Sequence, residues 1–142
     1  MKSFIVALSL LAVGMSSAAA DPIADRKALM KERGGLIGQL APIAKGEQPF
    51  DAAKVADVFA ALEANAGKHD IDAMYPETSK TGDTKASPKI WEDLAGYKAA
   101  SEKYKADTAA AVAAKPQDVD AFRAEFGKIT ANCGACHQAF RL

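Results

Sequence analysis

The residues best suited to chemistry lie near the C-terminal end of the 142-residue chain, in the run Cys133-Gly134-Ala135-Cys136-His137. Side chains three positions apart are neighbours on a helix, so two thiols at this spacing can add to the two vinyl groups of one flat macrocycle. The imidazole of His137 follows at once and can bind iron. The C-x-x-C-H spacing therefore predicts one haem c, held by two thioether bonds from Cys133 and Cys136, with His137 as the proximal iron ligand.

Three other kinds of site use two cysteines at this spacing: a thioredoxin-like redox pair, a simple disulfide and half of a zinc site. A thioredoxin-like pair opens a helix within a βαβ unit, whereas these cysteines lie in the last helical segment of the chain. A structural zinc ion takes four protein ligands, and only His69 offers an obvious further one. Haem attachment is the interpretation that also uses the adjacent histidine.

Residues 1–20 have the pattern of a secretory signal, with Lys2, the apolar run from Phe4 to Val13 and the small residues before Asp21. The apolar run is shorter than the roughly 20 residues of a spanning helix, so no stable membrane insertion is expected. We therefore predict removal of residues 1–20, export to the periplasm, and a single domain over residues 21–142.

The charge balance gives no basic surface for nucleic acid or anionic lipid. The chain has 18 lysines and arginines against 18 aspartates and glutamates, with a formal net charge of +0 at pH 7. Since binding to nucleic acid depends on clustered positive charge, no nucleic-acid partner is expected.

The periodicity of apolar residues predicts an all-α fold. Apolar side chains recur at helical spacing in four segments, which run from Pro22 to about Gly46, from Asp51 to Gly67, from Pro88 to Lys115, and from Asp118 to Phe140. A polar connection over residues 69–86 separates the second segment from the third. Because the other links are short, the four segments favour an antiparallel up-down-up-down four-helix bundle, in which the first and last helices are neighbours.

The motif, the helical plan and several further residues resemble the cytochrome c′ and cytochrome c-556 family, the class II c-type cytochromes. The supporting residues are Phe140-Arg141 after the motif, Arg26 in the first helix, the turn from Lys45 to Ala52, and Ile90-Trp91. The resemblance implies a four-helix bundle with covalently bound haem. It also implies that Arg26 pairs with a haem propionate and that Arg141 lies close to the proximal histidine.

The family differs internally at the distal face of the haem, where cytochromes c′ have a non-ligating apolar residue and c-556-like members have methionine. Met30 stands four residues after Arg26, at the matching position, so the resemblance is closer to the c-556 type. Helical rise places Met30 about 12 Å and His137 about 7.5 Å from the same end of the bundle. The alternative is that Met30 is a core residue, since methionine fills gaps between helices. His69 and Met74 rank below it and are interpreted as a solvated loop histidine and a loop anchor.

These features predict a periplasmic electron carrier with one low-spin haem, His137 and Met30 as axial ligands, and no catalytic residues. The alternative is a five-coordinate protein that binds nitric oxide or carbon monoxide, as cytochromes c′ do. Peroxidase-like turnover is disfavoured because His69 is the only evident distal acid–base group. The expected partners are redox proteins, and the resemblance leaves open a homodimer through the first two helices.

Overall fold

The computed structural model describes residues 21–142, so the predicted signal segment lies outside the described residues. Four long helices and three short ones follow one another along this part of the chain. They are α1 (Pro22–Ala44), α2 (Ala52–Gly67), α3 (Ile71–Met74), the 3₁₀ helix η1 (Glu77–Ser79), α4 (Lys89–Glu92), α5 (Leu94–Ala114) and α6 (Val119–Phe140).

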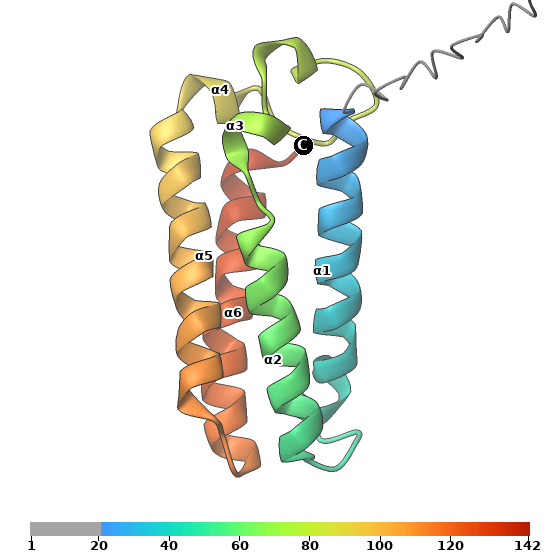
Figure 1. Cartoon of the computed structure of the whole chain (residues 1–142), viewed down its shortest axis with the longest axis vertical. Coiled ribbons are helices and arrows are strands. Elements are labelled where there is room, and N and C mark those ends of the chain that lie inside the picture. Colours follow the sequence, from blue (N-terminus) through green and yellow to red (C-terminus); the bar gives the residue numbers. More distant parts are fainter. Residues whose placement is uncertain (1–20) are drawn as a thin grey trace, which may run out of the picture.

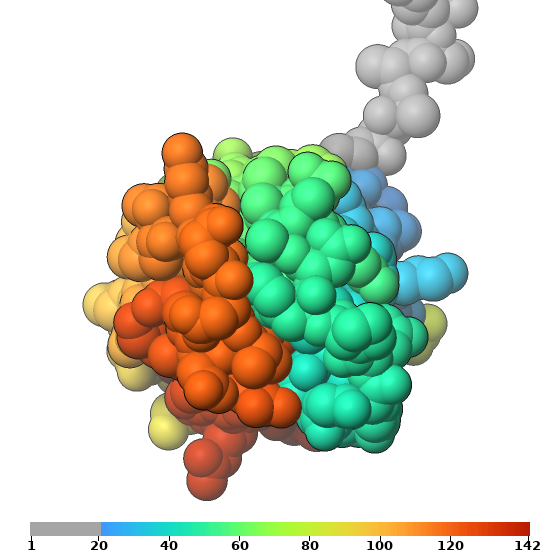
Figure 2. Space-filling view, turned by 90° about the horizontal axis from the view of Figure 1, so that it is seen from below, coloured from blue at the N-terminus to red at the C-terminus, as the bar shows by residue number. Residues whose placement is uncertain are grey.

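The long helices α1, α2, α5 and α6 run alternately down and up as an antiparallel four-helix bundle, with the short helices at one end (Figure 1). Helix α1 contacts both α2 and α6, and α5 contacts both α2 and α6, so the four helices enclose a common core. At the opposite end, the turns between α1 and α2 and between α5 and α6 lie side by side and cover the bundle (Figure 2). The predicted all-α bundle is confirmed.

An aspartate precedes each of the four long helices. The Asp21 carboxylate accepts hydrogen bonds from the first backbone N–H groups of α1, and Asp51 and Asp118 do the same for α2 and α6. A carboxylate at this position satisfies donors that have no partner within the helix and interacts favourably with the helix dipole. Gly46 closes α1 with a φ of 77°, a conformation that glycine adopts without steric cost.

The third predicted helix is interrupted, which corrects the expectation of one continuous segment. Helix α4 ends at Glu92, and Asp93 has non-helical φ and ψ angles of −132° and 61°. The Asp93 carboxylate accepts a hydrogen bond from the backbone N–H of Gly96 at 2.9 Å and so begins α5 anew. Aspartate competes in this way with helix continuation because its side chain can bind the local backbone.

Two clusters of buried side chains fill the bundle. The larger one is centred on Phe122, which is fully buried and has ring neighbours in Phe50, Phe59 and Phe126 with centroids 5.4–6.1 Å away. The smaller one lies near the short helices and consists of Ile71, Tyr75, Ile90, Tyr97 and Phe140. The predicted haem residues lie between these two clusters, because Cys133 packs against the larger and Cys136 against the smaller.

Candidate haem site

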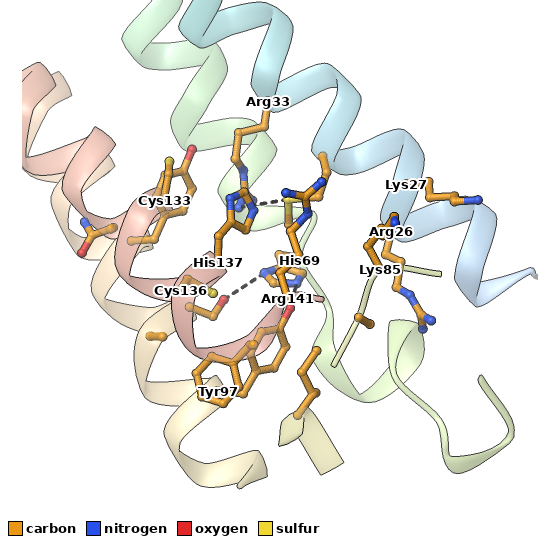
Figure 3. Close-up of a pocket in the computed structure, with 18 of the residues that line it drawn as sticks. Arg26, Lys27, Arg33, His69, Lys85, Tyr97, Cys133, Cys136, His137 and Arg141 are labelled. Carbon is orange, nitrogen blue, oxygen red and sulfur yellow. Dashed lines mark hydrogen bonds between the residues drawn. The ribbon is translucent and has the colours of Figure 1, made fainter. Parts of the chain in front are cut away.

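A cavity of about 570 Å³ opens between α1, α5, α6 and the segment that precedes α4. Met30, Cys133, Cys136 and His137 all line it. Figure 3 shows the two cysteines and His137 on α6, with α1 crossing the other side of the cavity. Its volume falls within the roughly 300–1,000 Å³ usual for cofactor sites.

The two cysteines are half-buried free thiols on successive turns of α6. Cys133 donates a weak hydrogen bond from Sγ to the carbonyl of Ile129 at 3.5 Å. Burial raises the pKa of both thiols, so both are protonated before they react. In residues 21–142, no three His, Cys, Asp or Glu side chains come together as the protein-only metal site that the zinc alternative requires.

His137 lies on the same helix and faces the cavity. Burial lowers its pKa, and the positive charges of Arg141 and Arg33 lower it further. The imidazole is therefore neutral at pH 7, which leaves a nitrogen lone pair for a metal ion. Its backbone carbonyl accepts a hydrogen bond from the N–H of Arg141 at 3.1 Å, which ends α6 directly after the motif.

Met30 reaches the cavity from α1, the antiparallel neighbour of α6. Its side chain is half-buried, and its Sδ accepts a weak hydrogen bond from Nη1 of Arg33 at 3.9 Å. The tertiary structure thus brings a thioether and an imidazole to one cavity from opposite ends of the sequence.

The charges that line the cavity all have the same sign. Of the described residues around it, none is an aspartate or glutamate, while the cationic side chains are those of Arg26, Lys27, Lys31, Arg33, Lys85 and Arg141. The chain as a whole has a formal net charge of +0, so this is a local concentration of positive charge. Such a wall fits a flat apolar macrocycle that carries two carboxylates, as haem does.

Comparison with known proteins agrees with this geometry. A family model described as Cytochrome C' matches residues 21–141. The chain belongs to the cytochrome c′ family. Its cofactor is therefore haem c, covalently bound, as the sequence predicted.

Individual relatives carry both names used within this family. A cytochrome c′ from Rhodopseudomonas palustris is 39% identical over 140 residues, which cover 96% of this chain and 92% of the relative. A cytochrome c-556 from Agrobacterium fabrum is 38% identical over 124 residues, which cover 87% and 83%. The solved structure of cytochrome c′ from Rhodopseudomonas palustris has a TM-score of 0.80 and covers 87% of this chain and 97% of that structure at 39% identity.

In this cytochrome, Arg26 organises the segment between α2 and α4. The side chain is 4% exposed. Nη1 donates to the carbonyl of Met74 and to Oγ of Ser79, and Nη2 donates to the carbonyl of Ser79 and to Oγ1 of Thr84, at 2.8–3.0 Å. The guanidinium also lies 5.0 Å from the ring centroid of Tyr75. Both terminal nitrogens are thus engaged by this segment, while the resemblance assigned them to a propionate.

Arg141 is exposed at the mouth of the cavity, one residue after α6. It pairs with Ala86 in an isolated antiparallel bridge, and the neighbouring N–H of Leu142 donates to the carbonyl of Lys85 at 2.9 Å. These contacts hold the end of the chain beside His137.

His69 is buried, so its interpretation as a solvated loop histidine is wrong. It is 5% exposed, with Nδ1 3.0 Å from Oγ of Ser101 and Nε2 3.3 Å from the hydroxyl of Tyr97. Burial is the main cause that lowers its pKa, to about 4. The segment after α2 turns back over α5, and this long-range packing carries the polar ring inside.

Met74 is half-buried against the smaller cluster and is not among the residues that line the cavity.

Arg33, Tyr97 and Tyr104 also line the cavity but were not assigned to the site from the sequence. Arg33 follows Met30 by three positions and therefore shares its helix face, which was the available signal. Tyr97 and Tyr104 lie two turns apart on α5, and only the packing of α5 against α6 reveals which of its faces meets the cavity.

Proposed function

We propose that this cytochrome is a one-electron carrier in which His137 and Met30 are the axial ligands of one haem, attached through Cys133 and Cys136. The observation that carries the proposal is that all four side chains line one cavity, although Met30 comes from the first helix and the others from the last. Bound haem supplies a reversible iron(III)/iron(II) couple.

The protein's own groups would set the reduction potential of the iron. The neutral imidazole of His137 and the neutral thioether of Met30 add no negative charge at the iron, and a thioether favours the ferrous state relative to a second imidazole. The lysines and arginines around the cavity also favour the ferrous state, because positive charge stabilises the state with one more electron.

Buried aromatic side chains would limit access of water to one side of the site. Phe140 packs edge-on against Tyr97, with centroids 5.2 Å apart, and both line the cavity. An apolar surround of this kind lowers the local dielectric constant and so strengthens the effect of nearby charges.

The cellular setting belongs to the same proposal. Signal-like residues 1–20 support export to the periplasm, and no helix in residues 21–142 is long and apolar enough to cross a membrane. We infer that redox proteins are the partners, with Arg141 and Lys85 at the cavity mouth available to meet an acidic surface. We also propose that the protein has no enzymatic turnover of its own and can form a homodimer.

A second candidate function is binding of nitric oxide or carbon monoxide at a five-coordinate iron. Two observations favour it: a relative named cytochrome c′ is 39% identical, and Sδ of Met30 already accepts a hydrogen bond from Arg33. A sulfur lone pair engaged in that way is less available to a metal.

Absorption spectra of the purified holoprotein, oxidised, reduced, and reduced with carbon monoxide, separate the two functions. A low-spin spectrum that carbon monoxide leaves unchanged supports the electron carrier, and a high-spin spectrum that shifts with the gas supports the second function. Met30→Ala should convert the first behaviour into the second, whereas Met74→Ala, outside the cavity, should not. A Met30→Ala protein with an unchanged low-spin spectrum would rule out Met30 as a ligand.

A further inference from the structure

Two buried polar atoms without a hydrogen-bond partner occur in residues 21–142, and both belong to residues that line the haem cavity. They are Nη2 of Arg33, on α1, and the hydroxyl oxygen of Tyr104, on α5. Buried donors are nearly always satisfied, so an orphaned pair in one cavity requires an explanation.

Arg33 is held in place rather than free to turn toward solvent. Its Nε donates to Oδ1 of Asn65 at 2.8 Å, and its guanidinium lies 4.2 Å from the ring centroid of Tyr104. Asn65 is itself fully buried and donates from Nδ2 to the carbonyl of Leu29 at 3.2 Å. Figure 3 shows the Arg33 side chain extending from α1 toward Cys133 and His137.

Glu32 is attracted electrostatically to the Arg33 guanidinium, but no carboxylate forms a hydrogen bond with Nη2. Glu32 accepts hydrogen bonds from Lys68 and from Nδ2 of Asn65, and Asp107 accepts from Lys103 and Asn132. Neither is among the residues that line the cavity. The cation therefore faces a wall that contains only positive and neutral groups.

Both donors keep their protons at neutral pH. A guanidinium remains charged under all ordinary conditions. Burial raises the pKa of Tyr104 to about 12 although the charge of Arg33 acts in the opposite direction, so its hydroxyl also stays protonated. Because the Arg33 guanidinium lies against the Tyr104 ring, the two residues together offer one charged and one neutral donor to an anionic oxygen. Charge-assisted hydrogen bonds are the strong ones.

We infer that Arg33 and Tyr104 form an oxyanion-binding site inside the haem cavity, with Nη2 of Arg33 and the Tyr104 hydroxyl as the two donors. The ligand chemistry is a carboxylate, supplied either by a propionate of the haem itself or by a small free carboxylate that enters beside it. The inference rests on the presence of covalent haem, but not on ligation by Met30 or on electron transfer.

The test is the reduction potential of the holoprotein, measured against pH between about 5 and 9 and, separately, against acetate concentration at constant ionic strength. The variants are Arg33→Gln, which removes the charge, and Tyr104→Phe, which removes only the hydroxyl. Lys31→Gln is the matched control, because Lys31 also lines the cavity but is exposed.

Each source of the carboxylate predicts its own result. If a propionate is held, the reduction potential changes at the pH where the propionate loses its proton. This pH should rise by about one unit or more in Arg33→Gln, and by less in Tyr104→Phe. If a free carboxylate is held, acetate lowers the potential of the wild-type protein, and this dependence disappears in both variants. Lys31→Gln removes one of the positive charges around the cavity and so lowers the potential at every pH alike, but it should leave either dependence unchanged.

His69 also faces the cavity, and its pKa of about 4 lies just below the pH range of the experiment, while Arg26, Lys27, Lys85 and Arg141 add fixed charge. Repeating the pH series in His69→Gln separates the histidine contribution from that of a carboxylate. The inference is overturned if Arg33→Gln behaves as Lys31→Gln does, or if Tyr104→Phe has no effect in either series. Haem content and the unliganded absorption spectrum show whether each variant has folded, and Tyr104→Phe remains decisive if Arg33→Gln does not fold.

Discussion

Replacing Arg26 by methionine should destabilise the protein strongly, because the Arg26 side chain holds the segment between α2 and α4 from inside. Methionine keeps much of the length and the apolar stem but removes every donor. Two of the four hydrogen bonds, those to Oγ and the carbonyl of Ser79, are buried. The other two, to Met74 and Thr84, are partly buried, so water can replace the lost donor there.

The expected loss in the free energy of unfolding follows from the two buried hydrogen bonds. A hydrogen bond to a charged group contributes about 1.5–3 kcal/mol, and an abandoned buried acceptor costs a similar amount. Allowing for partial relaxation of the segment, we expect Arg26→Met to lower the free energy of unfolding by about 3 kcal/mol. Lost stacking on Tyr75, whose ring centroid is 5.0 Å from the guanidinium, acts in the same direction.

Urea unfolding of the ferric holoprotein, followed by the fluorescence of Trp91, measures this change. Trp91 is the only tryptophan in the chain, and its ring centroid is 5.8 Å from the Arg26 guanidinium. Lys27→Met is the matched control, since the neighbouring Lys27 pairs with Asp83 at 2.5 Å on the exposed side of the same segment. An exposed pair of this kind contributes little, so the control should unfold almost as the wild type does. The reasoning fails if Arg26→Met costs less than about 1 kcal/mol or cannot be told from Lys27→Met.

Two further predictions concern the motif and His69. Replacing either Cys133 or Cys136 by serine should leave one thioether bond, and replacing both should release the haem during denaturing electrophoresis; haem that stays with the double variant would contradict the attachment. Because the folded pKa of His69, about 4, lies below its ordinary 6.5, the unfolded chain binds the proton more tightly, and stability must fall as the pH drops through this interval. Between pH 7 and 5 the loss should be about 2 kcal/mol, and His69→Gln should show a much smaller one in the same urea titrations. Equal pH dependence in both proteins would mean that His69 is not the group responsible.

Much of the fold could be predicted from the sequence because helix signals are local. Asp21, Asp51 and Asp118 act within three residues of their own position, and α1, α2 and α6 begin where these residues indicate. Asp93 carries the same signal, but it lies within a periodic segment that continues on both sides, so the break there was missed. The antiparallel arrangement of neighbouring helices could be predicted because most links between them are short.

The proposed haem attachment site is equally local, since Cys133, Cys136 and His137 fall within five consecutive residues whose chemistry depends only on their spacing along one helix. The sequence by itself predicted this part of the site, and it determined the helical class of the fold. The resemblance to the family identified Met30 as the candidate opposite His137.

Only the tertiary structure decided what surrounds that motif. Arg33 and Tyr104 meet because α1 and α5 face the same cavity, and periodicity along either helix does not reveal the position of the other. His69 is buried because the segment after α2 folds back onto Tyr97 and Ser101, some thirty residues later in the chain. Burial, charge and hydrogen-bond partners at the site are properties of such long-range contacts, and they govern pKa values and redox behaviour through the local dielectric environment.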